Sequence, residues 1–214
     1  MERICYIVGA VPLDGCLPQP GEGDYLIAAD AGYTALAAAG VTPDLVIGDY
    51  DSLGAPPKHP NVISHTPIKD DTDTMLAVRW ALEKGFRRFA LYGVLGGRRL
   101  DMTVASFQTL RFLAAHGARG MLVGDGWKVV LLENGMLRFG ASAKGTLSVF
   151  CAGEPAEGVT LRGLRYTMEN GTITGAFPIG VSNAFVGEPA EISVKNGMLY
   201  VLWQDDVRPE EVPL

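Results

Sequence analysis

Short apolar runs separated by helix-length patterns dominate the first 124 residues. The runs are apolar at nearly every position, which is typical of strands buried on both faces of a sheet. They cover residues 4–8, 25–29, 45–47, 62–64, 89–92 and 121–123. Between them lie three candidate helices, at 31–39, 72–84 and 101–116, and the first two end near Gly40 and Gly85. This alternation predicts an α/β domain with a mainly parallel sheet.

The pattern changes after about Gly124. Candidate strands then follow one another without helices, at 128–132, 145–150, 158–161, 171–174, 190–194 and 198–203. Asn-Gly turn signals occur at 133–135, 169–171 and 195–197. Closely spaced short strands with Asn-Gly turns predict an antiparallel sandwich or barrel. We therefore expect two domains, an α/β domain of residues 1–124 and an all-β domain of residues 125–214.

Composition excludes several classes of partner. The formal net charge is −6, and no basic patch with interleaved aromatic residues occurs, which argues against binding to nucleic acid. No apolar run approaches the roughly 18 residues of a membrane span. The three cysteines have neither metal-ligand nor disulfide-framework spacing, as expected in a reducing compartment. We expect a cytoplasmic protein with no membrane partner.

Acidic residues gather where the predicted strands and helices of the first domain meet. They are Asp30, Asp49 and Asp51 after strands, Asp70, Asp71 and Asp73 around a helix start, and Asp101 at the start of the next helix. The carboxyl ends of strands in an open α/β sheet line one edge, where ligands bind. Each acid alone is explained equally well as a helix cap or turn residue. Together they would repel by about 1 kcal/mol or more per close pair, so a cation is expected among them.

The residue types predict that this cation is Mg²⁺. Mg²⁺ takes oxygen ligands and usually binds through one or two carboxylates plus substrate phosphates. Asp49 and Asp51 suit this role because residues two apart in an extended chain point the same way. Arg98 and Arg99 follow glycines before a helix start and can bind an anion, as can Lys69. The residues thus predict a Mg²⁺-dependent enzyme acting on a nucleoside triphosphate or similar polyphosphate, with the acceptor left open.

Five segments, in this order, resemble thiamine pyrophosphokinase: ADAG (29–32), PDLVIGDYDS (43–52), KDDTD (69–73), GGRRLD (96–101) and GVSN (180–183). The resemblance extends over nearly the whole chain. It implies a Rossmann-like α/β domain that binds the nucleotide and an all-β sandwich or barrel that binds thiamine and forms a dimer. The implied reaction transfers the pyrophosphoryl group of ATP to thiamine, giving thiamine diphosphate and AMP. The implied assembly is a homodimer with thiamine held between the β-domain of one subunit and the α/β domain of the other.

The resemblance also assigns roles to residues by matching position. It implies that the metal and polyphosphate are held by an acidic cluster of Asp30, Asp49, Asp51, Asp73 and Asp101, with Asp49, Asp51 and Asp73 on Mg²⁺. Lys69 and Arg98 or Arg99 would contact phosphate oxygens, and Asp73 or Asp101 would accept the proton of the thiamine hydroxyl. Ser182 and Asn183 would bind thiamine.

The chain departs from the family pattern at several positions. Tyr50 stands where the family usually has Phe, Met102 replaces a usual His, and Tyr166 replaces a usual Trp. An acidic residue is frequent where Ala184 stands, and the segment 96–101 carries an extra Arg. Three other classes stay open: a pyrophosphokinase with another acceptor, a Mg²⁺-dependent nucleotidyl- or glycosyltransferase, and a binding module without turnover.

Overall fold

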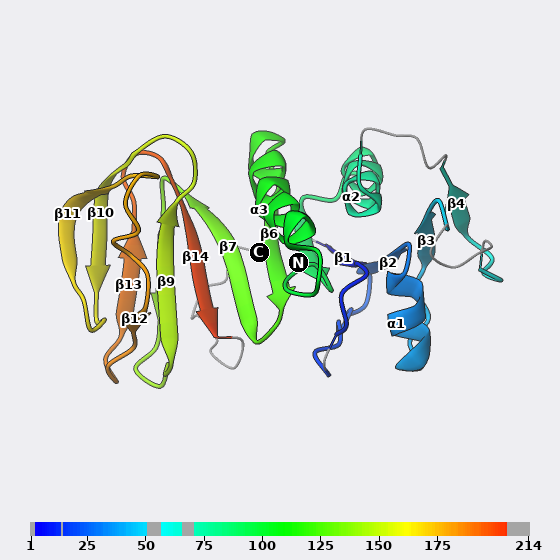
Figure 1. Ribbon diagram of the computed structural model, residues 1–214, viewed down its shortest axis with the longest axis horizontal. Helices are drawn as coiled ribbons and strands as arrows, with labels where there is room; N and C mark the ends of the chain where they lie inside the picture. Colours follow the sequence, from blue (N-terminus) through cyan, green and yellow to red (C-terminus); the bar gives the residue numbers. More distant parts are fainter. Residues whose placement is uncertain (1–2, 14, 51–56, 66–70, 205–214) are drawn as a thin grey trace. The chain divides into compact units, whose positions relative to one another are not determined.

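The chain consists of two compact units, one ending at Asp125 and the other beginning at Gly126. The computed structural model describes residues 3–13, 15–50, 57–65 and 71–204 (Figure 1). Asp51 and Lys69, two residues of the predicted site, lie outside these ranges. Within the described residues, no helix is long and apolar enough to cross a membrane.

The first unit contains a sheet whose described pairs are all parallel. Its strands are β1 (Ile4–Val8), β2 (Tyr25–Ala29), β3 (Leu45–Gly48), β4 (Val62–Ser64), β5 (Arg88–Tyr92) and β6 (Arg119–Gly124). Their spatial order is β6-β5-β1-β2-β3-β4. Because β2 and β3 are parallel neighbours, the residues that follow them leave the sheet side by side.

Helices cover both faces of this sheet. They are α1 (Gly32–Ala38), α2 (Asp73–Glu83) and α3 (Leu100–Ala115), and Figure 1 shows α1 and α2 on opposite sides of β1–β3. Each helix is followed, two residues on, by a glycine with positive φ: Gly40 (71°), Gly85 (86°) and Gly117 (65°). Glycine adopts this conformation without a Cβ penalty, which is why it ends helices.

The second unit consists of two antiparallel sets of strands. One has the order β12-β9-β14-β7 and the other β11-β10-β13-β8. The strands are β7 (Trp127–Glu133), β8 (Met136–Phe139), β9 (Thr146–Cys151), β10 (Ala156–Arg162), β11 (Met168–Ile173), β12 (Asn183–Ala184), β13 (Ala190–Ser193) and β14 (Met198–Gln204). Strand pairing over the chain is thus mixed, parallel in the first unit and antiparallel in the second.

Aromatic packing joins the two sets of strands. Phe139 of β8 is fully buried, and its ring lies edge-on to Trp203 of β14, with ring centroids 5.5 Å apart. The ring of Phe185 meets the same Phe139 at 5.0 Å. Edge-to-face pairs of this kind add to the burial of apolar area, so Phe139 lies at the centre of the core of this unit.

The three predicted helices are confirmed within one residue at each end. The sequence reading missed β8 and β12 and was wrong about the turn at 169–171. Residues 169–171 lie within β11, where Asn170 has φ 50° and the pairing with β10 shifts register, so this Asn-Gly marks a bulge. The turn at 195–197 is confirmed, because these residues connect β13 to β14, which belong to different sets of strands.

Replacement of Phe139 by Ala tests the core of the second unit. We expect Phe139→Ala to lower the free energy of unfolding by about 3–5 kcal/mol, because the cavity lies between two aromatic partners. Urea unfolding of the intact chain measures this. Met136→Ala, on the same strand at a side chain 44% exposed, is the control and should cost about 1 kcal/mol or less. Equal losses in both variants would contradict the assignment.

Candidate functional site

Asp30 and Gly48 meet where β2 and β3 end. The Asp30 N–H donates to the Ile47 carbonyl at 2.8 Å, which extends the pairing of the strands by one residue. Gly48 is buried, and a Cβ on it would lie only 3.1 Å from the Asp30 Cα. Asp30 itself has φ 45°, a left-handed conformation that is uncommon for a residue with a side chain. The approach is tight enough that a side chain at position 48 would require Asp30 to shift, so the two strand ends leave the sheet close together.

Gly32 fits the first turn of α1 against β1. A Cβ at this position would collide with the Val8 carbonyl. The N-cap position of α1 is Ala31, and no side chain caps this helix. The alternative that Asp30 serves as a helix cap is therefore wrong, since its carboxylate does not take that position.

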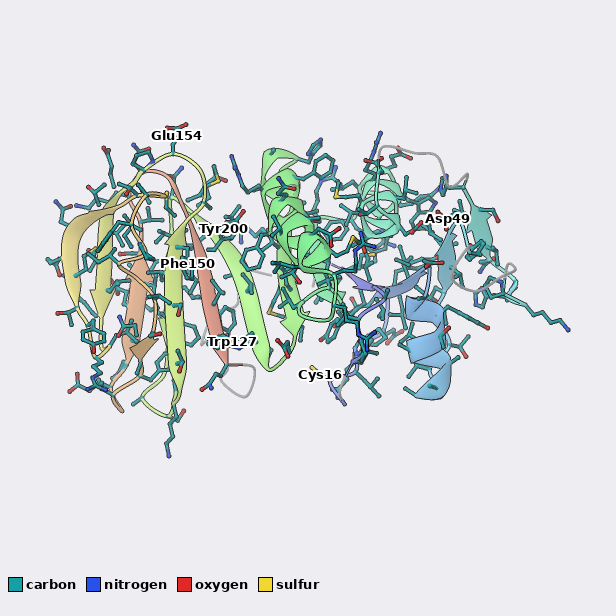
Figure 2. All side chains as sticks on the ribbon, viewed as in Figure 1. Cys16, Asp49, Trp127, Phe150, Glu154 and Tyr200 are labelled. Carbon is teal, nitrogen blue, oxygen red and sulfur yellow. The ribbon has the colours of Figure 1, made fainter. Side chains whose placement is uncertain are left out.

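Tyr50 separates the two acids that were predicted to act as a pair. Its φ is 60° and its side chain is 2% exposed, with the hydroxyl 2.9 Å from the Ile63 carbonyl and 3.1 Å from the Val46 carbonyl. The backbone is therefore not extended at this residue. The argument that Asp49 and Asp51 point the same way because the chain is extended is wrong. Figure 2 labels Asp49 at the end of β3.

Asp73 is the first residue of α2, but it is not the cap. Thr72 holds that position, and its hydroxyl accepts a hydrogen bond from the Met75 N–H at 3.2 Å. Asp71 forms an ion pair with Arg79 at 2.6 Å. Because Thr72 caps the helix, the Asp73 carboxylate is not needed as a cap. It lies in the first turn, where the helix dipole favours negative charge.

The pKa of Tyr50 indicates which carboxylates lie near it. Burial first, and then the charges of Asp30 and Asp73, raise this pKa to about 12, while a hydrogen bond with Ser64 acts in the opposite direction. Asp30 follows β2 and Asp73 begins α2, so two elements bring acids to the residues that follow β3. Among the described residues, however, no three His, Cys, Asp or Glu side chains form a group that could hold a metal ion.

Arg99 and Asp101 form an exposed ion pair at the start of α3. The guanidinium donates to both carboxylate oxygens, with its shortest contact at 2.6 Å, and both side chains are more than half exposed. The hydrogen bond from Arg99 holds the pKa of Asp101 below its usual range. Arg98 is exposed, and within the described part of the chain it has no hydrogen bond or ion pair. Asp101 is thus occupied by Arg99, whereas Arg98 is available to an anion.

The two residues predicted to bind thiamine differ in their surroundings. Ser182 is exposed, with φ 58°, and its N–H donates to the hydroxyl of Ser148 at 3.1 Å. Asn183 is buried. Its amide oxygen accepts from the Tyr166 N–H at 2.9 Å, and its amide nitrogen donates to the Tyr166 carbonyl at 2.7 Å. Asn183 therefore holds the main chain of Tyr166, whose own side chain is 60% exposed.

Sequence reasoning missed the supporting residues Thr72 and Ser148 and the burial of Tyr50. Thr72 gave a readable signal, a threonine directly before a predicted helix. Ser148 gave a weaker one, a polar residue in an apolar strand.

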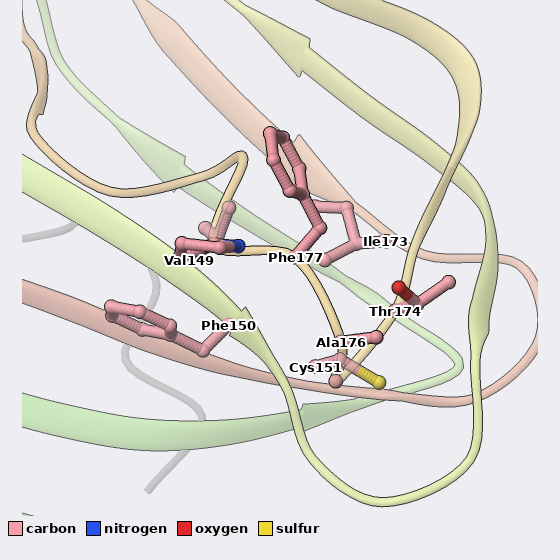
Figure 3. Close-up of a pocket in the computed structure, with 9 residues that line it drawn as sticks. Val149, Phe150, Cys151, Ile173, Thr174, Ala176 and Phe177 are labelled. Carbon is pink, nitrogen blue, oxygen red and sulfur yellow. The ribbon is translucent and has the colours of Figure 1, made fainter.

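A pocket of about 130 Å³ lies in the second unit (Figure 3). It is bordered by β9 and by the segment after β11, with Val149, Ile173 and Phe177 among its lining. None of the predicted site residues lines this pocket. It therefore gives no support for placing a substrate there.

Comparison with known families matches both units of the chain. The family model described as thiamin pyrophosphokinase, catalytic domain, matches residues 21–121, and the one described as thiamin pyrophosphokinase, vitamin B1 binding domain, matches residues 137–199. The chain belongs to the thiamine pyrophosphokinase family. Among its relatives is thiamine pyrophosphokinase of Bacillus subtilis, 26% identical over 187 residues, which cover 84% of this chain and 87% of the relative.

Solved structures in the thiamine pyrophosphokinase family have the same fold. The Bacillus subtilis enzyme superposes with a TM-score of 0.78 at 25% identity, covering 96% of this chain and 100% of that one. Thiamin pyrophosphokinase of Geobacillus thermodenitrificans gives 0.76 at 26% identity, covering 95% and 98%. The yeast enzyme gives 0.70 at 18% identity, covering 94% and 86%, which supports the fold alone.

Replacement of Asn183 tests its hold on Tyr166. We expect Asn183→Ala to destabilise the chain by about 1–2 kcal/mol, because two partly buried hydrogen bonds to the Tyr166 main chain are lost. Urea unfolding gives the magnitude. Ser182→Ala is the control, since the structure uses the Ser182 N–H rather than its hydroxyl, and it should unfold like the wild type. An Asn183→Ala variant with unchanged stability would contradict this role.

Proposed function

We propose that this chain transfers the pyrophosphoryl group of ATP to thiamine, giving thiamine diphosphate and AMP. The observation that carries the proposal is the gathering of carboxylates after β2, after β3 and at the start of α2, in a chain whose two units match the two domains of one family. Residues 1–124 would be a Rossmann-like nucleotide-binding and catalytic domain. Residues 125–214 would bind thiamine and form the dimer.

Mg²⁺ suits the residue types at this edge of the sheet, where Asp51, one of its proposed ligands, lies outside the described residues. The available donors are carboxylates, the hard oxygen ligands that Mg²⁺ prefers, and substrate phosphates would complete the set. Asp49, Asp51 and Asp73 would hold the ion. When bound, Mg²⁺ neutralises charge on the polyphosphate. Asp30 would complete the acidic cluster, while Lys69 and Arg98 would contact phosphate oxygens as cations.

Proton transfer would fall to Asp73 or Asp101. In the reaction, the hydroxyl oxygen of thiamine bonds to the β-phosphorus, and the bond from that phosphorus to the oxygen of AMP breaks. The hydroxyl proton passes to one of these carboxylates. The ion pair of Asp101 with Arg99 lowers the pKa of Asp101 and with it its basicity, and Mg²⁺ would do the same to Asp73. Arg99 orients Asp101.

Thiamine would bind at Ser182, with Asn183 holding the neighbouring main chain. The segment around these residues exposes large apolar side chains, which supports a homodimer that buries them. They are Phe177 (66%), Ile179 (54%), Val181 (47%) and Val186 (50%). The three free cysteines agree with a cytoplasmic location.

Product analysis tests the proposed reaction. The intact chain is incubated with Mg²⁺, ATP and thiamine, and the nucleotide and thiamine products are separated. The proposal expects AMP and thiamine diphosphate in a one-to-one ratio and no product without Mg²⁺. Formation of ADP, or of free pyrophosphate without thiamine diphosphate, would overturn it. A pterin alcohol offered in place of thiamine tests a different acceptor, and faster turnover with it would also overturn the assignment.

Asp49 is expected to be essential for turnover. Asp49→Asn removes one charge from the metal-binding group, so kcat should fall about 100-fold or more. Circular dichroism should be unchanged, because Asp49 is partly exposed at the end of a strand. Asp44→Asn, the same substitution at the residue directly before β3, serves as the control and should leave kcat unchanged. Retained activity in Asp49→Asn would remove this residue from the metal site.

The two arginines are expected to differ. Arg98→Ala should raise the KM for ATP about tenfold, because a charge-assisted hydrogen bond to phosphate is lost. Arg99→Ala should raise it less, since Arg99 is already paired with Asp101. Arg111→Ala, an exposed arginine further along α3, is the control and should match the wild type. Steady-state kinetics with ATP varied measures all three, and the reverse order for Arg98 and Arg99 would contradict the assignment.

A further inference from the structure

We infer that the Tyr50 hydroxyl positions Asp49 for Mg²⁺, so that Tyr50 is a positioning residue for the metal site. The inference rests on the proposed function. It concerns an atom that the usual Phe of the family lacks at this position.

The residue before Asp49 is held from both sides. Gly48 ends β3, and its carbonyl accepts a hydrogen bond from the His65 N–H at 3.0 Å. On the other side, a Cβ at Gly48 would lie 3.1 Å from the Asp30 Cα, so the two backbones are tightly packed here. The main chain entering Asp49 therefore has little freedom to move.

The residue after Asp49 is held by its own side chain. The Tyr50 ring packs with Val8, Leu26 and Val46 in the core between β1–β3 and α1. Its hydroxyl lies within hydrogen-bond distance of the Val46 and Ile63 carbonyls, which share its one proton. These contacts join Tyr50 to both β3 and β4.

The backbone of Tyr50 needs such contacts. A left-handed φ of 60° costs a residue with a Cβ free energy, and it persists only where the surrounding structure imposes it. The ring supplies part of this restraint, and the hydroxyl supplies the rest. Asp49 is consequently a single residue between two fixed neighbours, an arrangement that sets the direction of its carboxylate before any ligand binds.

Removal of the hydroxyl alone tests the inference. Tyr50→Phe keeps the ring, and it restores the usual residue of the family, so the variant is expected to fold. Mg²⁺ is titrated into the intact protein in the presence of a non-hydrolysable ATP analogue, and its binding is measured by calorimetry. We expect the Mg²⁺ concentration at half saturation to rise about three- to tenfold, as for the loss of one hydrogen bond. The KM for thiamine should stay unchanged.

Tyr25→Phe is the matched control. Tyr25 begins β2, at the opposite end of the parallel sheet, so loss of its hydroxyl should leave Mg²⁺ binding unchanged. A folded Tyr50→Phe variant with wild-type Mg²⁺ binding would overturn the inference, even if its stability were lower. So would an equal effect in both variants.

Hydrogen exchange gives a second readout that does not depend on turnover. The His65 amide donates to Gly48, so it should exchange several-fold faster in Tyr50→Phe than in the wild type, while amides of β5 keep their rates. Unchanged exchange at His65 would overturn the inference. Failure of the wild type to form thiamine diphosphate would refute the proposed function. The Tyr50 inference is decided independently, by Mg²⁺ binding in the calorimeter.

Discussion

The approach of β2 to β3 at their carboxyl ends is the constraint on which the candidate site depends. One hydrogen bond, from Asp30 to the carbonyl of Ile47, carries the strand pairing into the residues that follow, and the absence of a side chain at Gly48 lets the two backbones meet. The segments after β2 and β3 then each turn at a residue with left-handed φ, Asp30 and Tyr50. Parallel pairing thus brings Asp30 and Asp49 to one edge of the sheet. The left-handed backbone at Asp30 and Tyr50 sets the point where each segment turns away from its strand.

Much of the fold follows from local signals in the sequence. The helices were predicted within one residue at each end. The spacing of their apolar residues indicates the buried face, and a glycine after the helix indicates where it ends. The strand β8 was missed, although its Leu137 and Phe139 are buried and alternate with exposed residues. The second Asn-Gly looked like a turn, yet it forms a bulge, since pairing with β10 and not the dipeptide decides the conformation.

The candidate site was less predictable than the fold. Its acids could be named from their place after strands, but their surroundings depend on contacts between residues far apart in the chain. The hydroxyl of Tyr50 reaches Ile63, and the amide of Asn183 reaches Tyr166, 17 positions away. No local pattern encodes these contacts. A left-handed conformation at tyrosine is equally hidden, because sequence rules reserve it for glycine and asparagine.

The two hydrogen bonds between the Asn183 side chain and the Tyr166 main chain affect which substitutions position 166 tolerates. The amide holds only main-chain atoms, so it imposes no requirement on the side chain at position 166. That side chain can be exchanged during evolution, as the tyrosine in place of the usual tryptophan illustrates, while the loop that presents it keeps its shape. The exposed side chain at position 166 can accordingly be altered by an engineer without disturbing this loop, and Asn183 is the residue to leave untouched.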